Sequence, residues 1–179
     1  MKQSGTTLLE LMVVLSIAGI LLAIGIPAFS YLAHSSRLSS ATNEMVSSLH
    51  LTRSEAIKRS SRVVMCTSAT GTSCAASGGW DQGWVVFHDA NNNASVDAGE
   101  TVILAQPALP QGYRMKGDSK VSRYISYSSS GGTKHISGAF QAGALTLCKV
   151  SGSSDAARKI IISSTGRART AKVVLAACP

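Results

Sequence analysis

Aromatic residues are scarce in this chain of 179 residues, which has only 2 Trp, 4 Tyr and 3 Phe. Glycine and serine are plentiful in the second half instead. This balance favours short strands and turns over a large helical core. The length suits one globular domain in addition to an N-terminal helical stalk.

Patterns of catalytic residues are also missing. The 4 histidines are dispersed and fall in no nucleophile or zinc motif, and the many serines include no G-x-S-x-G elbow. No two cysteines have the C-x-x-C spacing of common zinc sites. The sequence therefore predicts a protein without enzymatic activity, metal or cofactor.

One acidic stretch needs separate weighing, because its oxygen-bearing residues have the spacing of a calcium loop. These residues are Asp89, Asn91, Asn93, Ser95, Asp97 and Glu100. The sixth position is Ala94, where the sharp turn of a calcium loop requires glycine, and strands are expected on both sides in place of helices. A hairpin loop rich in Asn and Asp is the simpler interpretation, with calcium as the open alternative.

All 4 cysteines lie outside the long apolar segment, and an even number in an exported domain indicates disulfides. More than one pairing is possible. We favour Cys66–Cys74, which closes a short loop, and Cys148–Cys178, which ties the C-terminus to a strand.

Acidic residues are scarce in the last third of the chain. Between Arg114 and Pro179 there are 11 basic residues and 2 acidic ones, against 6 and 7 in the preceding part. Such asymmetry indicates a polyanion or an anionic surface as partner, although an ordinary solvated surface would show it as well.

The N-terminal segment carries a long apolar run, which Glu10 alone interrupts between Leu8 and Ile26. The run approaches the ~20 residues that cross a bilayer as a helix, exceeds the usual core of a secretory signal and lacks a clean small-x-small cleavage site. Helical patterning continues beyond it, so we expect one helix over residues 6–60, with 6–28 as its transmembrane or filament-core part. Its apolar stripe consists of Leu38, Ala41, Met45, Leu49, Thr52 and Ala56.

Residues 61–179 are predicted to form an antiparallel β domain, so the fold class is α+β. The expected strands are 62–67, 84–88, 102–105, 113–116, 123–127, 145–150, 159–162 and 172–175. The last two flank a hairpin turn with Gly166 available for positive φ and with Arg167 and Arg169 at its tip. We add the nearby basic residues Lys149, Arg158, Lys159 and Lys172 to the same candidate site on charge and proximity.

Two stretches resemble a known family. Lys2, Gly5, Thr6, Glu10 and the apolar run resemble a prepilin signal. The resemblance implies cleavage after Gly5 by prepilin peptidase, methylation of Thr6, and pairing of Glu10 with the N-terminal amine of a neighbouring subunit. Residues 1–5 would be the leader. It further implies insertion in the inner membrane with a periplasmic domain, followed by assembly into a pilus with major and minor pilins.

The stretch 51–59 and the strands near Trp84 and Val102 resemble the FimT/GspH minor pilins and pseudopilins, which implies the type IV pilin fold. The Gly166-Arg-Ala-Arg169 turn resembles the DNA-contacting tail of FimT-type minor pilins. Extracellular DNA, bound through its phosphates with little sequence preference, is then the implied partner during natural transformation. Two alternatives stay open, a FimU-like minor pilin that primes assembly and a pseudopilin of type II secretion.

Overall fold

The computed structural model describes residues 7–150 and 155–179, and the predicted leader, residues 1–5, lies outside this range together with Thr6. The chain divides into two compact units, Met1–Arg37 and Leu38–Pro179. Helix α1, Leu8–Lys58, contributes to both. From Leu8 onward the first unit is helical, and Leu8–Ile26 is long and apolar enough to cross a membrane. Thr7 is the N-cap of the helix, because its Oγ1 accepts a hydrogen bond from the backbone N–H of Glu10 at 3.3 Å.

Helix α1 ends at Lys58, slightly before the predicted end at residue 60. Ser60 adopts a left-handed conformation with φ 50°, which cannot continue the helix. The N–H of Ser60 donates to the carbonyl of Ile57 at 3.1 Å, and the N–H of Ser61 donates to that of Ala56 at 3.2 Å. These two bonds form a Schellman motif, with serine in the position that glycine usually holds.

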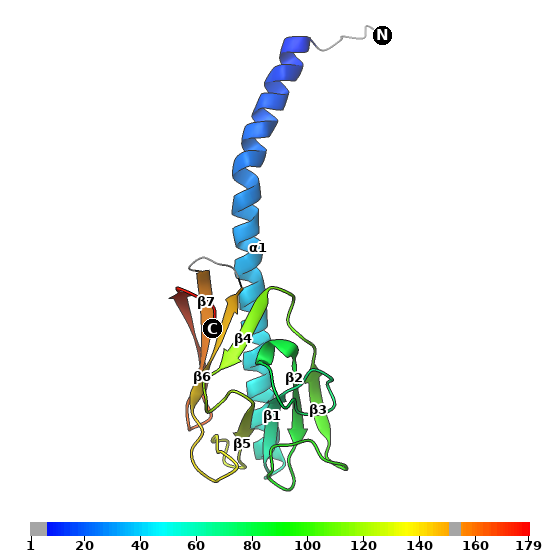
Figure 1. Ribbon diagram of the computed structural model, residues 1–179, viewed down its shortest axis with the longest axis vertical. Helices are drawn as coiled ribbons and strands as arrows, with labels where there is room; N and C mark the ends of the chain where they lie inside the picture. Colours follow the sequence, from blue (N-terminus) through cyan, green and yellow to red (C-terminus); the bar gives the residue numbers. More distant parts are fainter. Residues whose placement is uncertain (1–6, 151–154) are drawn as a thin grey trace. The chain divides into compact units, whose positions relative to one another are not determined.

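Two antiparallel sheets of four strands pack with α1 in the second unit (Figure 1). Sheet A has the order β3-β2-β1-β5 and sheet B the order β4-β6-β7-β8. Sheet A consists of β1 Val63–Thr67, β2 Trp84–His88, β3 Val102–Gln106 and β5 Tyr124–Tyr127. Sheet B consists of β4 Tyr113–Gly117, β6 Gly143–Lys149, β7 Asp155–Ile162 and β8 Ala168–Leu175. A 3₁₀ turn, η1 Trp80–Gln82, precedes β2.

All eight predicted strands are present, but the last two are longer than predicted. Strand β7 begins at Asp155 instead of Lys159, and β8 begins at Ala168 instead of Lys172. The two strands pair over their whole length, from Asp155 opposite Leu175 to Ile162 opposite Ala168. Ladder pairing thus extends the strands through basic residues that have little strand preference of their own.

One hydrophobic core holds the two sheets and the helix together. The predicted stripe of α1 is buried, with Leu38, Met45 and Leu49 at most 1% exposed. It packs with Met65 and Trp84 of sheet A and with several residues of sheet B, namely Met115, Leu145, Leu147, Ile160 and Ile162. Because these core residues all lie between Leu38 and Ile162, removal of residues 1–29 would expose none of them.

The two disulfides join Cys66 to Cys74 and Cys148 to Cys178, the pairing favoured from the sequence. Cys66 also belongs to a smaller apolar cluster with Val64, Val85 and Phe87. This cluster lies on the face of sheet A that points away from the main core, since Val63, Met65 and Val86 belong to the main core. The loops around Cys74 and Ala94 cover it, which explains why β1 is buried on both faces.

Candidate functional site

The turn between β7 and β8 is closed by its own hydrogen bonds. The N–H of Gly166 donates to the carbonyl of Ser163 at 2.9 Å, and the N–H of Ser163 donates to the carbonyl of Arg167 at 3.1 Å. The Ser163 hydroxyl accepts from the N–H of Arg167 at 3.2 Å. Gly166 has the positive φ predicted for it, 78°. The side chain of Arg167 therefore leaves a rigid turn and is exposed.

This turn does not protrude freely, because it is docked on the rest of the domain. The carbonyl of Gly166 accepts a hydrogen bond from the Tyr127 hydroxyl at 3.2 Å and from the Arg53 guanidinium at 3.4 Å. The carbonyl of Ser164 accepts from the N–H of Thr133 at 3.0 Å. Burial raises the pKa of Tyr127 to about 12, so its hydroxyl keeps the proton that it donates at neutral pH. The main chain of the turn is thus fixed from strand β5 and from α1.

Two predictions for this turn need correction. Gly166 is buried, and a Cβ built on it would collide with the carbonyl oxygen of Gly131 and lie 2.9 Å from a ring carbon of Tyr127. It is a packing residue and cannot itself contact DNA. Arg169 is not at the tip, since it is the second residue of β8 and pairs with Ile161. Arg167 and Arg169 nevertheless line one shallow hollow of about 320 Å³ together with Ser163.

Strand alternation separates the other predicted basic residues into two groups. Ile160 and Ile162 of β7 face the core, so Lys159 lies on the opposite, outer face of sheet B. Arg169 lies on the same outer face, because its ladder partner Ile161 is in phase with Lys159. Lys159 and Arg169 are diagonal neighbours on adjacent strands, with Cβ atoms roughly 7–8 Å apart.

Lys149, Arg158 and Lys172 lie on the other side. Lys149 is in phase with the core residues Leu145 and Leu147, and Arg158 and Lys172 are ladder partners in phase with Ile160. Arg158 is only 8% exposed, so a DNA backbone cannot reach it. Proximity in sequence predicted that these three residues share one surface with Arg167 and Arg169. The structure shows that they do not.

Strand β4 adds two basic residues to the outer face that the sequence analysis missed. Arg114 and Lys116 are exposed and alternate with the buried Met115. Lys116 pairs with Thr146 of β6, and Thr146 pairs in turn with Lys159 of β7. The two lysines are therefore two strands apart, a distance of about 10 Å. They line a hollow of about 200 Å³, which Pro179 and Asp118 also line. The alternation of basic and apolar residues in the predicted strand 113–116 could have identified Arg114 and Lys116 as residues of an exposed face.

We call the outer basic face the set Arg114, Lys116, Lys159, Arg167 and Arg169. Two acidic side chains lie beside it, Asp118 and Asp81, and Asp81 lines a hollow together with Arg114 and Lys116. The two oxygens of Asp118 accept from the N–H groups of Lys120 at 3.1 Å and Ala144 at 2.7 Å, and Asp81 accepts from the N–H of Met115 at 3.3 Å. Backbone donors thus already hold both carboxylates. All five cations are exposed, and Arg114 also donates to the carbonyl of Pro179 at 3.2 Å. Chemically, the face offers charge and planar guanidinium donors to an extended anion.

The loop from Asp89 to Glu100, the candidate calcium loop, shows no arrangement of ligands for a metal ion among the described residues. The loop from Asp89 to Glu100 uses its carboxylates internally: Asp97 accepts from the side-chain amides of Asn91 and Asn93, at 2.7 and 2.6 Å. Burial raises the pKa of Asp89, whose oxygens accept from the backbone N–H groups of Asn93 and Ala94. Ala94 adopts φ 57°, the left-handed conformation for which a calcium loop uses glycine. Among the described residues, no three acidic, Cys or His side chains are grouped to hold a metal.

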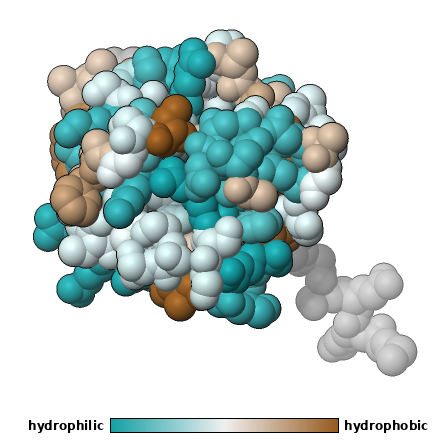
Figure 2. All heavy atoms as spheres, turned by 90° about the horizontal axis from the view of Figure 1, so that it is seen from below, coloured by the Kyte–Doolittle hydropathy of each residue, from teal (hydrophilic) through white to brown (hydrophobic). Residues whose placement is uncertain are grey.

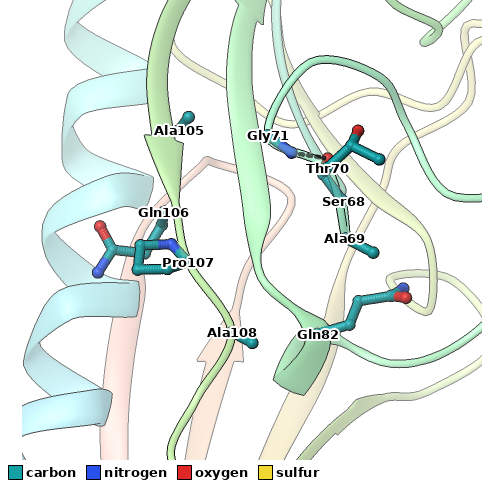
Figure 3. Close-up of a pocket in the computed structure, with 9 residues that line it drawn as sticks. All are labelled: Ser68, Ala69, Thr70, Gly71, Gln82, Ala105, Gln106, Pro107 and Ala108. Atoms are coloured by element: carbon teal, nitrogen blue, oxygen red, sulfur yellow. Dashed lines mark hydrogen bonds between the residues drawn. The ribbon is translucent and has the colours of Figure 1, made fainter.

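Another hollow, of about 290 Å³, lies between the loop that starts at Ser68 and the end of β3 (Figure 3). It is lined by Ser68, Ala69, Thr70, Gly71, Gln82, Ala105, Gln106, Pro107 and Ala108. The side chain of Gln106 points toward α1, where it donates to Glu44 at 3.5 Å. This hollow contains no ionisable side chain and offers no general acid, base or nucleophile beyond serine and threonine hydroxyls.

The sequence of the domain matches the family model "Type II transport protein GspH" over residues 41–166. The chain belongs to the GspH family. Residues 1–26 match the prokaryotic N-terminal methylation motif, which implies processing by prepilin peptidase. No curated protein matches the chain.

Solved structures agree on the fold. The Pseudomonas aeruginosa type IV minor pilin FimU is similar with a TM-score of 0.62 and 16% identity, over 83% of this chain and 99% of that one. The minor pseudopilin EpsH of the Vibrio cholerae type 2 secretion system is similar with a TM-score of 0.50 and 12% identity, over 78% and 97%. The predicted type IV pilin fold is thereby confirmed. This GspH-family protein is a minor pilin or pseudopilin, a subunit that associates with other pilins, and its apolar helix fits a membrane-anchored pilin assembled into a pilus.

Proposed function

We propose that this GspH-family protein is a FimT-type minor pilin, which binds extracellular DNA for uptake in natural transformation. The observation that carries the proposal is the outer basic face, on which Arg167 of the docked turn and Arg169 of β8 lie beside Lys159. The Gly166-Arg-Ala-Arg169 motif resembles the DNA-contacting tail of FimT-type pilins, which adds a second, independent support. The protein would be inserted in the inner membrane, processed at Gly5 and extracted into the pilus.

The geometry of the face suits a phosphate backbone better than base edges. Its cations come from three strands of sheet B, β4, β7 and β8, and from the turn before β8. Lys116 and Lys159 are about 10 Å apart, so the cations would meet several phosphates instead of one base pair. Phosphate contacts give affinity without sequence preference and release counterions on binding. Binding should therefore weaken steeply as salt rises.

The test compares two double variants of the fragment 30–179, which retains the whole core. Arg167→Gln with Arg169→Gln removes two charges from the outer basic face, and Lys149→Gln with Lys172→Gln removes two from the other side of the sheet. Affinity for duplexes of unrelated sequence is measured by fluorescence anisotropy across a salt series. The first variant should lose about 0.9 of salt slope for each phosphate contact removed, and the second should keep the wild-type slope.

Two results would contradict the proposal. Equal losses in the two variants would mean that net charge alone drives binding. Unchanged affinity in a folded Arg167→Gln, Arg169→Gln variant would remove the motif from the contact. In cells, the same variant should reduce DNA uptake while pili persist, and a loss of pili would favour the FimU-like assembly role or that of a type II secretion pseudopilin.

A further inference from the structure

Arg158 is an arginine in a core-facing position, and no ion pair joins it to another described residue. It follows the phase of Ile160 and Ile162 on β7, and it is 8% exposed. Its one hydrogen bond is a long contact from Nη1 to the carbonyl of its own neighbour Ala157, at 3.4 Å. In the described part of the chain only Glu55 forms ion pairs, and its partners are Lys58 and Arg59. A buried cation without a counter-ion is costly, so the structure calls for a reason to keep it.

The side chain lines a cleft of about 310 Å³ between α1 and the edge strand β8. The lining residues are Ser39, Thr42, Asn43, Arg158, Thr170, Ala171 and Lys172. Among the described residues, none of those that line the cleft is acidic. Thr42 already donates its hydroxyl to the carbonyl of Leu38 at 2.6 Å. Arg158, Lys172, Asn43 and Thr170 remain to contact a ligand, and this set of two cations, an amide and a hydroxyl is suited to an anion.

The recessed position of Arg158 decides between kinds of anion. The phosphates of a duplex lie on the surface of a stiff cylinder, and they cannot enter a cleft to reach a side chain that is 8% exposed. A carboxylate on a flexible side chain can enter and can meet the guanidinium with two oxygens. The cleft also opens beside β8, which is the edge of sheet B and leaves one side of its backbone to a neighbour.

We propose that this cleft receives an Asp or Glu side chain of a neighbouring pilin subunit during filament assembly. The partner is a different pilin, because this chain has 17 basic and 9 acidic residues and would repel a second copy. The unpaired guanidinium then selects the partner: it is uncompensated in the free subunit and becomes paired on assembly. The proposal rests on membership of the pilin family and does not depend on DNA binding.

No large apolar surface competes for this role on the face drawn in Figure 2, which is mostly hydrophilic with apolar residues scattered singly. Scattered exposed apolar residues are normal for a soluble surface and do not indicate a docking site.

The experiment uses the full-length protein in piliated cells, with a photoreactive amino acid in place of Thr170. Illumination should link it to another pilin, and mass spectrometry should place the linked peptide next to an Asp or Glu. Arg158→Gln should reduce this adduct at least several-fold. Arg123→Gln removes an exposed arginine before β5 and serves as the control, which should leave the adduct unchanged. Arg158→Glu should abolish the adduct, and exchange of the identified acid for Arg should restore it.

Three outcomes would overturn the proposal: an adduct that Arg158→Gln leaves unchanged, an adduct with DNA, or no restoration by the exchanged charges. A second measurement guards against misfolding. Arg158→Met removes a buried unpaired charge, so the fragment 30–179 should unfold at the same or a higher temperature while adduct formation falls. A strongly lowered unfolding temperature would assign Arg158 a structural role instead. The salt slope of DNA binding should not change in Arg158→Gln, which separates this proposal from the proposed function.

Discussion

Replacement of Gly166 by alanine tests the docked turn directly, because two independent penalties meet at this residue. Its φ of 78° costs an L-residue about 1–2 kcal/mol. A Cβ would also overlap the carbonyl of Gly131 and lie 2.9 Å from Tyr127, and relief of such overpacking costs about 1–3 kcal/mol. If the turn moves to relieve it, the hydrogen bond from the Tyr127 hydroxyl is lost, at about 1 kcal/mol.

The matched control is Gly138→Ala. Gly138 has φ 85°, and nothing lies within 4 Å of the Cβ that alanine would add. This variant therefore carries the conformational penalty alone, reduced by the lower entropy that alanine gives to the unfolded chain. We expect about 1 kcal/mol of destabilisation for Gly138→Ala and about 3–5 kcal/mol for Gly166→Ala.

The assay is urea and thermal unfolding of the fragment 30–179, followed by circular dichroism. At about 2–4 °C per kcal/mol, Gly166→Ala should lower Tm by roughly 10 °C and Gly138→Ala by roughly 3 °C. Equal shifts in the two variants would refute the close packing of the turn on Gly131 and Tyr127. Because the turn also carries Arg167, the folded fraction of Gly166→Ala should bind DNA more weakly than that of the control.

Three further predictions concern processing, assembly and the disulfides. Gly5→Val should leave a full-length, membrane-held precursor in immunoblots of membrane fractions, and a mature N-terminus other than Thr6 by mass analysis would contradict the prepilin reading. Glu10→Ala should reduce incorporation into pili several-fold, because the resemblance gives Glu10 an amine partner in the filament. The fragment 30–179 lacks this residue and is unaffected. Normal incorporation of the variant would contradict the proposed role of Glu10. Peptide mapping of unreduced protein should recover Cys66–Cys74 and Cys148–Cys178 with almost no free thiol, and a Cys66–Cys148 link would refute the pairing.

Much of the fold followed from periodicity in the sequence. The stripe on α1 was predictable because burial recurs at the helical period, and the central strands were predictable from β-branched runs such as Val63–Thr67. The Cys66–Cys74 pair followed from proximity in sequence, and Cys148–Cys178 was favoured because it ties the C-terminus to a strand. The ends of β7 and β8 did not follow, because Ala156–Arg158 and Ala168–Ala171 are strands through ladder pairing and not through their own preferences.

The candidate site was predictable in composition but not in arrangement. Arg167 and Gly166 could be placed at a turn from local sequence, yet the burial of Gly166 depends on Tyr127 and Gly131, which are distant in sequence. Charge and proximity grouped Arg158 with Lys159 as if both met one ligand. Strand alternation would have separated them, because adjacent residues in a strand point to opposite faces and only Arg158 is in phase with Ile160.

This phase relation separates the cations of one hairpin into two sets, and each set belongs to a different proposed anion site. On β7 and β8, Lys159 and Arg169 point outward, whereas Arg158 and Lys172 point toward the α1 side. A slip of one residue in register would exchange the two sets and expose Ile160, so the buried isoleucines maintain the separation. In the two proposals, the outward cations on the open face bind an extended polyanion, and the inward cation in the cleft binds a single carboxylate. Variants of the two faces should therefore have additive effects, with loss of DNA affinity from one and loss of the filament contact from the other.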